Sequence, residues 1–472
     1  MVAPRDSSPG RVAGAVEDSR RKIVPRNCAS GRLRSVPVRT AFRFFAVSLG
    51  KGGIAPRRSK IAARVLKQSA RAFSDWGRSV AWSVVVPAAC LTAIGCAAIA
   101  RAAELSDNPE WFGRFARQQA FFAVGGFAML LALSVADYRW AARWAYGLLI
   151  LSLLLLCAVF FFAPINNACR WVRVGPFGFQ PAELAKWTFV CAVARHAADS
   201  GGYRTLRSFL VPLGMLAAVV GLILKQPDLG TAAVFVPVLL LMLYVGGAGL
   251  RSLLVVVALG AACLPLLWAM MNEEQRSRVG AVFERIEPDK PPAGGNYQLY
   301  QARRVMSLGG FWGSAVTGEP VDETAVYRVP EAHNDFVFCV VVERWGIVGG
   351  GAVLLLHAVL AWRCLAVARK CGDAFGRLFI VGWTALTAVQ TVINVGMTAG
   401  LLPVTGLPLP LLSYGGSALA TQAVGIGLIL SIGRRTQYEF GPDPFRRADS
   451  GGDARHAAES RLSGPIIAGS GD

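Results

Sequence analysis

The chain has 472 residues, of which 54% are apolar and 17% are charged, and its mean hydropathy is positive at +0.45. Apolar runs of 18 or more residues recur along most of its length, which excludes a single soluble core and predicts a polytopic helical membrane protein. The net charge of +20 does not indicate nucleic-acid binding, because the basic residues gather in the N-terminal segment and in short loops, where cytoplasmic anchoring and anionic lipid headgroups explain them.

The first 78 residues form a basic segment rich in Ser, Gly and Pro. This segment lacks the compact apolar region and the small-residue cleavage site of a secretory signal. We expect a largely disordered cytoplasmic tail whose last part, residues 61–73, lies on the inner leaflet as a basic amphipathic helix. Residues 436–472 are polar and Gly-rich, and they predict a second disordered cytoplasmic tail.

Residues 79–435 contain ten apolar stretches, each of which predicts a transmembrane helix. They lie near 79–101, 118–136, 140–163, 182–198, 208–224, 231–249, 252–271, 336–362, 378–400 and 411–433. With the N-terminus inside, the arginines and lysines of the short inner loops all fall in the cytoplasm, as does the C-terminus. Ten scattered cysteines, most of them inside these runs, indicate neither a disulfide framework nor a zinc site.

This orientation places every unusual stretch of the chain on the outer face of the membrane. These stretches are residues 164–181, the KQPDLG turn at 225–230, the long segment 272–334 between helices 7 and 8, and the Gly/Pro-rich run 400–410. A loop of about 60 residues is usually functional or disordered. Its regular turn signals favour an ordered but irregular segment that lies over the bundle.

The stretch VPEAHNDFVF, residues 329–338, joins the long polar segment to the eighth span and places Glu331, His333 and Asp335 at the mouth of a membrane helix. Carboxylates at a membrane edge are costly. A carboxylate at a helix N-terminus is stabilised by the positive end of the helix dipole, and such capping accounts for one of the two acids. The functional interpretation makes Asp335 a general base whose pKa is shifted by partial desolvation.

A second candidate group precedes the fourth span. Glu183 and Lys186 fall three residues apart and so share one face of a helix. Either they form an ordinary ion pair, with Arg170 and Trp171 as interfacial anchors, or Lys186 offers its charge to an anionic headgroup and, if the fourth and eighth spans adjoin, to Asp335. An outer-edge lysine contributes little to packing, so we expect Lys186→Ala to weaken turnover with little loss of folding.

Three further stretches allow a structural or a functional interpretation. Asp228, in the KQPDLG turn, is placed to cap the sixth span. Arg278 belongs to a basic series that is either solvated or a clamp for pyrophosphate, together with Arg276, Arg285, Arg303 and Arg304. Residues 400–418, which include Ser413 and Tyr414, predict a re-entrant turn lining a cavity or a helix contact through paired glycines.

The motifs RW, QPAELAKW, QPDLG, YQLYQA, VPEAHNDF and LLPVTGLPLPLLSYGGSA, in this order on ten spans, resemble those of the SEDS family, which includes FtsW, RodA and SpoVE. The resemblance covers residues 80–435. It implies a peptidoglycan glycosyltransferase that polymerises lipid II at the outer face of the bacterial cytoplasmic (inner) membrane and releases undecaprenyl pyrophosphate. The implied partners are a class B penicillin-binding protein as transpeptidase, other division or elongation proteins and membrane lipids.

Carried over residue by residue, the resemblance places the family's essential aspartate on Asp335, in an HNDF setting where HTDF is common. It gives Glu183 and Lys186 the roles of the QPSExxK motif and Arg278 that of the loop arginine. Further candidate substrate contacts are Arg170, Glu331, His333, Ser413 and Tyr414. Lys186, Arg278 or a divalent cation, Mg²⁺ or Mn²⁺, would offset the charge of the leaving pyrophosphate.

Two motifs depart from the family pattern. VMSLGGFWGSAVTG stands where AIGSGGxxGxG is usual, and VERWG stands where GEExG is usual, with Arg344 in place of the second acid. PEAHNDF favours a division role, whereas VTGLPLPLLSYGGSA suits elongation. A lipid flippase and a non-catalytic scaffold for the transpeptidase are the alternatives from other classes, and ionisable residues clustered at the outer edge favour surface chemistry over flipping.

Overall fold

The computed structural model describes residues 81–104, 109–162, 170–174, 177–271, 273–280, 296–318 and 332–435. The predicted cytoplasmic tails, with the amphipathic helix expected at residues 61–73, lie outside these ranges. The described residues are mostly helical, which confirms the predicted all-α class.

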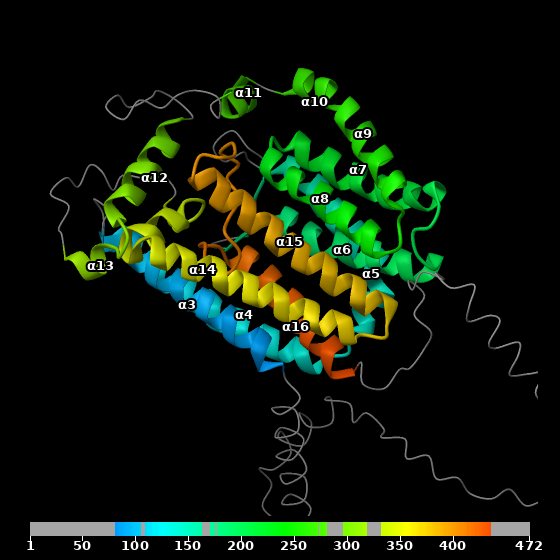
Figure 1. The fold of residues 1–472 in the computed structure, drawn as a ribbon, viewed down its shortest axis with the longest axis horizontal. Coiled ribbons are helices and arrows are strands. Elements are labelled where there is room, and N and C mark those ends of the chain that lie inside the picture. Colours follow the sequence, from blue (N-terminus) through cyan, green and yellow to red (C-terminus); the bar gives the residue numbers. More distant parts are fainter. Residues whose placement is uncertain are drawn as a thin grey trace, which may run out of the picture. The chain divides into compact units, whose positions relative to one another are not determined.

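Each of the ten predicted spans coincides with a helix or a pair of helices (Figure 1): α3 (Trp82–Glu104), α4 (Pro109–Val135), α5 (Arg139–Ala158), α6 (Pro181–Ser200), α7 (Leu210–Lys225), α8 (Leu229–Val245), α9 (Leu250–Ala262) with α10 (Leu264–Met270), α14 (Val337–Lys370), α15 (Ala374–Thr398) and α16 (Gly416–Arg435). Among the described helices, seven are long and apolar enough to cross a membrane: α3, α4, α5, α7, α14, α15 and α16. Helices α8 and α9 are shorter but apolar. Helix α6 has the length, but its four charged residues make it less apolar. The protein is a multi-pass membrane protein.

The loops predicted to lie on the outer face contain more regular structure than the sequence predicts. Before α6, β1 (Val172–Val174) and β2 (Phe177–Phe179) pair antiparallel, with Val172 opposite Phe179. The long segment after α10 includes α11 (Glu273–Gly280), α12 (Asn296–Gly309) and α13 (Ser314–Thr317). Helix α12 packs against α14, and it does so because Leu299, Ala302 and Val305 recur at helical spacing and are buried.

The loops predicted to share the outer face do gather at one end of the bundle. The Arg170 guanidinium donates to the carbonyl oxygens of Gln226, at 3.2 Å, and Pro227. Arg303 of α12 donates to the Ala399 carbonyl oxygen at 3.0 Å. These arginines therefore join the loop before α6 to the α7–α8 turn, and α12 to the end of α15.

The predicted inner loops meet at the opposite end. The Tyr138 hydroxyl, at the start of α5, donates to an oxygen of Asp373 before α15 at 3.1 Å. Arg434, at the end of α16, donates to the Ser134 carbonyl oxygen of α4 at 2.9 Å. Loops far apart in the sequence are thus sorted onto two ends as the alternation of spans requires.

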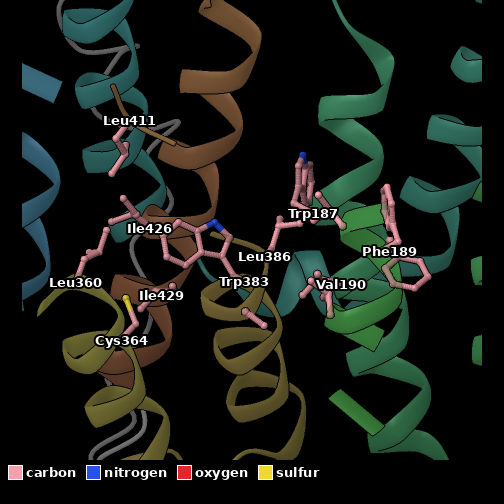
Figure 2. Packing of buried hydrophobic residues seen from close by; sticks show 14 of the residues in the cluster. Trp187, Phe189, Val190, Leu360, Cys364, Trp383, Leu386, Leu411, Ile426 and Ile429 are labelled. Atoms are coloured by element: carbon pink, nitrogen blue, oxygen red, sulfur yellow. The ribbon is translucent and has the colours of Figure 1, made fainter. Parts of the chain in front are cut away.

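Helix α15 forms the centre of the bundle and packs against α6, α8 and α14. Small residues let the helices approach closely: a Cβ at Gly382 would lie 2.6 Å from the Met242 sulfur of α8. Figure 2 shows Trp187 and Val190 of α6 toward Leu386 of α15. It shows Trp383 of α15 among residues of α14 and α16, namely Leu360, Cys364, Ile426 and Ile429.

Helix α14 is two helices joined at a sharp turn. Gly346 has a positive φ of 67° and a ψ of −168°, which no helix accommodates. A Cβ on Gly350 would lie 3.2 Å from the ring of Phe338, although twelve residues of straight helix would separate their backbones by about 18 Å. Residues 337–345, here called the half-helix, therefore double back on residues 347–370, the spanning helix (Figure 1).

The two motifs that depart from the family pattern pack against each other at this turn. The Ile347 amide donates to the Gly310 carbonyl oxygen at 3.1 Å. A Cβ on Gly309 would collide with the Val342 carbonyl, and one on Gly346 would collide with the Phe311 carbonyl. The glycines that this contact between backbones requires are present in this chain, so the altered side chains leave the contact intact.

We predict that Gly346→Ala destabilises the protein, because it adds a Cβ at a positive φ and against the Phe311 carbonyl. Backbone strain alone costs about 1–3 kcal/mol. Thermal unfolding of the purified protein in detergent, followed by tryptophan fluorescence, measures the effect.

The matched control is Gly351→Ala, at an exposed helical position with open space around the added Cβ. We expect this variant to keep or slightly raise the unfolding temperature. Equal unfolding temperatures for the two variants would contradict the assigned turn.

Candidate functional site

Asp335 lies in the turn that leads into the half-helix. Because the half-helix doubles back and is about 13 Å long, its first residues lie well inside the bundle, and residues from Val337 to Glu343 are buried. The predicted location at the outer mouth of a span is therefore corrected: the eighth predicted span begins with a re-entrant half-helix, and Asp335 sits at its inner end. Asp335 does not cap it, since the N-cap position is Phe336.

The Asp335 carboxylate is half-buried and faces the segment between α15 and α16. Its Oδ1 is enclosed by protein. On the other side, a Cβ on Gly406 would lie 3.2 Å from Oδ2. Gly406 has a positive φ of 69°, so a glycine both shapes this turn and keeps the space beside the carboxylate open.

Asn394 of α15 fixes the position of this turn. Its Nδ2 donates to the Asp335 carbonyl oxygen at 2.8 Å and to the Leu407 carbonyl oxygen at 2.7 Å. The Asn394 side chain is wholly buried. One amide group therefore holds the residue before the half-helix against residues 400–415, here called the re-entrant segment.

The re-entrant segment is non-helical backbone at membrane depth, as the sequence predicts. Leu412 packs against Gly95 of α3. Gly95 lies about 9 Å along the helix from Arg101, which is in the last turn of α3. Backbone carbonyls at this depth need partners, and side chains of the surrounding helices face them. Besides Asn394, a His357 ring nitrogen of α14 lies 3.2 Å from the Pro410 carbonyl oxygen, and Gln119 of α4 donates to the Ser413 carbonyl oxygen at 3.1 Å.

The structure brings His333, Ser413 and Tyr414 together beside this turn. The His333 ring stacks on Phe115 with centroids 4.5 Å apart, and the Tyr414 ring meets it edge-on at 5.6 Å. The Tyr414 amide donates to the His333 carbonyl oxygen at 2.9 Å. Ser413 Oγ accepts the Leu409 amide at 2.7 Å, so this hydroxyl closes a turn of the re-entrant segment.

Lys186 and Glu183 form a buried ion pair. Lys186 Nζ lies 2.7 Å from Glu183 Oε1, and the two side chains are only 1% and 3% exposed. Helix α6 packs against α5, α15 and α16 and, among these fully described helices, does not pack along α14. The structure therefore shows the ion pair that the first interpretation predicts. A direct pair between Lys186 and Asp335 stays a prediction.

The remaining candidates have structural partners or lie outside the described residues. Asp228 caps α8, where its Oδ1 accepts the Thr231 amide at 3.1 Å, as predicted. Arg170 donates to backbone carbonyls. The Arg278 side chain and all of Glu331 lie outside the described residues, so their roles stay predictions.

Sequence reasoning missed a row of polar side chains on α15. All of its members are buried: Thr387, Gln390, Thr391, Asn394 and Thr398. Their recurrence at intervals of three and four residues within an apolar span was the signal available in the sequence. Asn394 anchors the Asp335 turn, and Thr387 donates to the Gln422 side chain of α16 at 3.3 Å.

A second feature missed by sequence reasoning is a lateral apolar groove of about 350 Å³ between α3, α4 and α16. Its lining includes small side chains such as Ala89 and Ala93, and it also includes Leu411 of the re-entrant segment. The groove therefore reaches the segment that contacts His333 and lies beside Asp335. Its shape and apolar lining suit a hydrocarbon chain.

Residues 80–438 match the profile of the FtsW/RodA/SpoVE family, described as cell cycle protein. The chain belongs to this family. It is 30% identical over 330 residues to stage V sporulation protein E of Bacillus subtilis, covering 69% of this chain and 88% of the relative. It is 34% identical over 309 residues to peptidoglycan glycosyltransferase MrdB of Escherichia coli K12, covering 65% and 82%. The resemblance inferred from the motifs is confirmed.

Solved structures of the FtsW/RodA/SpoVE family share the fold. Rod shape determining protein RodA of Thermus thermophilus is 30% identical with a TM-score of 0.56, covering 76% of this chain and 98% of that one. A chain from a structure titled as a peptidoglycan synthase complex that coordinates polymerization and crosslinking is 31% identical with a TM-score of 0.63, covering 76% and 99%.

The burial of Lys186 reverses the expectation that its removal spares folding. We predict that Lys186→Met lowers the free energy of unfolding by about 3–5 kcal/mol, because it leaves the Glu183 carboxylate buried without its partner. Membrane yield and thermal unfolding measure the loss.

The double variant Glu183→Gln/Lys186→Met is the control, since it removes both charges together. We expect it to recover most of the lost stability. A single variant as stable as the parent would contradict the ion pair.

Proposed function

We propose that the protein is a peptidoglycan glycosyltransferase that polymerises lipid II and releases undecaprenyl pyrophosphate. The observation that carries the proposal is a half-buried carboxylate, Asp335, held beside Gly406 of the re-entrant segment, whose Leu411 lines a lateral apolar groove. This pairing suits a substrate with a reactive sugar and a long hydrocarbon tail. Relatives at 31–34% identity bear the name peptidoglycan glycosyltransferase, which supports the same activity here.

In the proposed reaction, Asp335 accepts the proton of a sugar 4-hydroxyl as that oxygen attacks the anomeric carbon of the donor disaccharide. A new glycosidic bond forms, and the bond from the anomeric carbon to the pyrophosphate oxygen breaks. The leaving undecaprenyl pyrophosphate takes the electron pair. Asn394 acts as a positioning residue, because it fixes the backbone on both sides of the carboxylate.

The charge of the leaving pyrophosphate needs a partner other than a free Lys186, since that ammonium is paired with Glu183. We propose Arg278 for this role, because guanidinium groups bind phosphate oxygens bidentately. A divalent cation, Mg²⁺ or Mn²⁺, is a further proposal. The described residues contain no group of three or more His, Cys, Asp or Glu that could hold a metal, so the protein forms no cage for it there, and pyrophosphate oxygens would supply most ligands.

We place the reaction at the outer face of the bacterial inner membrane, with both chain termini in the cytoplasm, because the half-helix that begins beside Asp335 re-enters from the end of the bundle opposite the Arg-rich inner loops. The proposed partner is a class B penicillin-binding protein, and its support is the synthase complex that contains a similar chain. Relatives named FtsW and MrdB match at similar identity. The role is therefore either division or elongation.

The test is polymerisation of labelled lipid II by the purified protein with its transpeptidase partner. We predict that Asp335→Asn lowers the rate by about 10²–10⁴-fold, the usual contribution of a general base, while the protein still folds. The matched control is Asp137→Asn, a half-exposed carboxylate in one of the predicted inner loops, which should polymerise at the parent rate. Polymer from Asp335→Asn at the parent rate would contradict the assigned base, and no polymer from the parent would favour a scaffold.

We further propose that the groove holds the hydrocarbon tail of lipid II, which can be tested separately. Ala93→Phe fills part of the groove from an exposed position on α3, and we expect it to raise the KM for lipid II with a smaller change in kcat. Ala128→Phe adds the same bulk at an exposed position of α4 outside the groove lining and should change neither. An equal KM for both variants would rule out the groove as the tail site.

A further inference from the structure

The loop between α12 and α13 exposes large apolar side chains. Phe311 and Trp312 are 58% and 57% exposed, and Leu308 and Val316 on either side are also exposed. The two aromatic rings meet edge to face with centroids 4.9 Å apart. A contiguous apolar patch of this kind is costly in water, so residues 308–316, here called the aromatic loop, need an apolar surrounding.

The backbone of the aromatic loop is fixed at the turn of α14. The Ile347 amide donates to the Gly310 carbonyl oxygen at 3.1 Å, and the Val348 amide donates to the Phe311 carbonyl oxygen at 3.4 Å. Gly313 fits against the Arg344 carbonyl with no room for a Cβ. The depth of the aromatic loop in the membrane is therefore the depth at which the spanning helix begins.

The spanning helix gives an estimate of that depth. At its inner part, the Arg363 guanidinium stacks on Trp362 at 4.6 Å, and Trp362 is 55% exposed, a pairing typical of a membrane interface. From Trp362 to Ile347 the helix rises only about 22 Å, whereas the hydrocarbon core is about 30 Å thick. The start of the spanning helix, and the aromatic loop on it, therefore lie at the level of the outer leaflet.

The exposed patch also continues the lipid-facing side of the spanning helix. Ile347 and Val348, whose amides bond to the aromatic loop, are themselves exposed, and so are Leu354 and Leu355 further along. Apolar side chains exposed on a membrane span face lipid. The patch is an extension of the same surface, so the same occupant covers both.

We propose that the aromatic loop is inserted into the outer leaflet, with Phe311 and Trp312 among lipid acyl chains. The proposal stands independently of the catalytic function. In that position, lipid contacts the same loop that packs against the Gly346 turn, where the half-helix that begins beside Asp335 ends.

The test replaces Trp312 with the photoreactive amino acid p-benzoylphenylalanine in the full chain, reconstituted into liposomes of radiolabelled phosphatidylethanolamine and phosphatidylglycerol. The same replacement at Leu355, on the lipid-facing side, is the positive control. At Ser277, an exposed polar residue of α11, it is the negative control. We expect lipid adducts at position 312 to match those at 355 and to exceed those at 277 by about tenfold, because the acyl chains are confined to the hydrocarbon layer.

Lipid labelling at position 312 no greater than at 277 would overturn the proposal. Crosslinking in native membranes supplies the second readout. A protein adduct at position 312 that replaces the lipid adduct would show that a partner protein covers the patch, and this would also overturn it.

Discussion

The site depends on one buried amide. Asn394 belongs to α15, and its Nδ2 donates to the carbonyl oxygens of both Asp335 and Leu407. Both carbonyls belong to irregular backbone at membrane depth, where water cannot replace a missing donor. Leaving two such acceptors unsatisfied would cost about 1–3 kcal/mol each. Together with the bond from the Tyr414 amide to the His333 carbonyl oxygen, the Asn394 amide therefore holds the turn before the half-helix against the re-entrant segment, and so holds the carboxylate beside Gly406.

A second constraint acts at the other end of the half-helix. The turn at Gly346 is packed so closely against the loop after α12 that no side chain fits at Gly309, Gly313 or Gly346. At this end Glu343, the wholly buried acid of the half-helix, lies 3.6 Å from Arg101 of α3. The half-helix is thus held at both ends, by an ion pair and backbone contacts near Gly346 and by Asn394 near Asp335. The nine residues of the half-helix therefore join the contacts of this loop to the turn that carries Asp335.

Much of this architecture could be predicted from the sequence. Hydropathy located the spans, the alternation of inner and outer loops sorted the motifs, and the Gly/Pro pattern at residues 400–418 predicted broken backbone. The fold of α14 could not be predicted in this way, because an apolar half-helix and an apolar span give the same hydropathy. The non-helical backbone at Gly346 and the contact of Gly350 with Phe338 separate them in the structure. Spacing placed Lys186 and Glu183 on one face but could not say whether that face meets lipid, water or the bundle interior.

The most direct measurement is the rate of lipid II polymerisation by Asn394→Ala, with Thr398→Ala, one turn further along the same buried face of α15, as the matched control. Both proteins should be compared at temperatures where thermal unfolding shows them folded. If Asn394 positions the carboxylate, its removal lowers the rate about as far as the loss of Asp335 itself, while the Thr398 variant stays near the parent. A folded Asn394→Ala protein that polymerises lipid II at the parent rate would contradict the account.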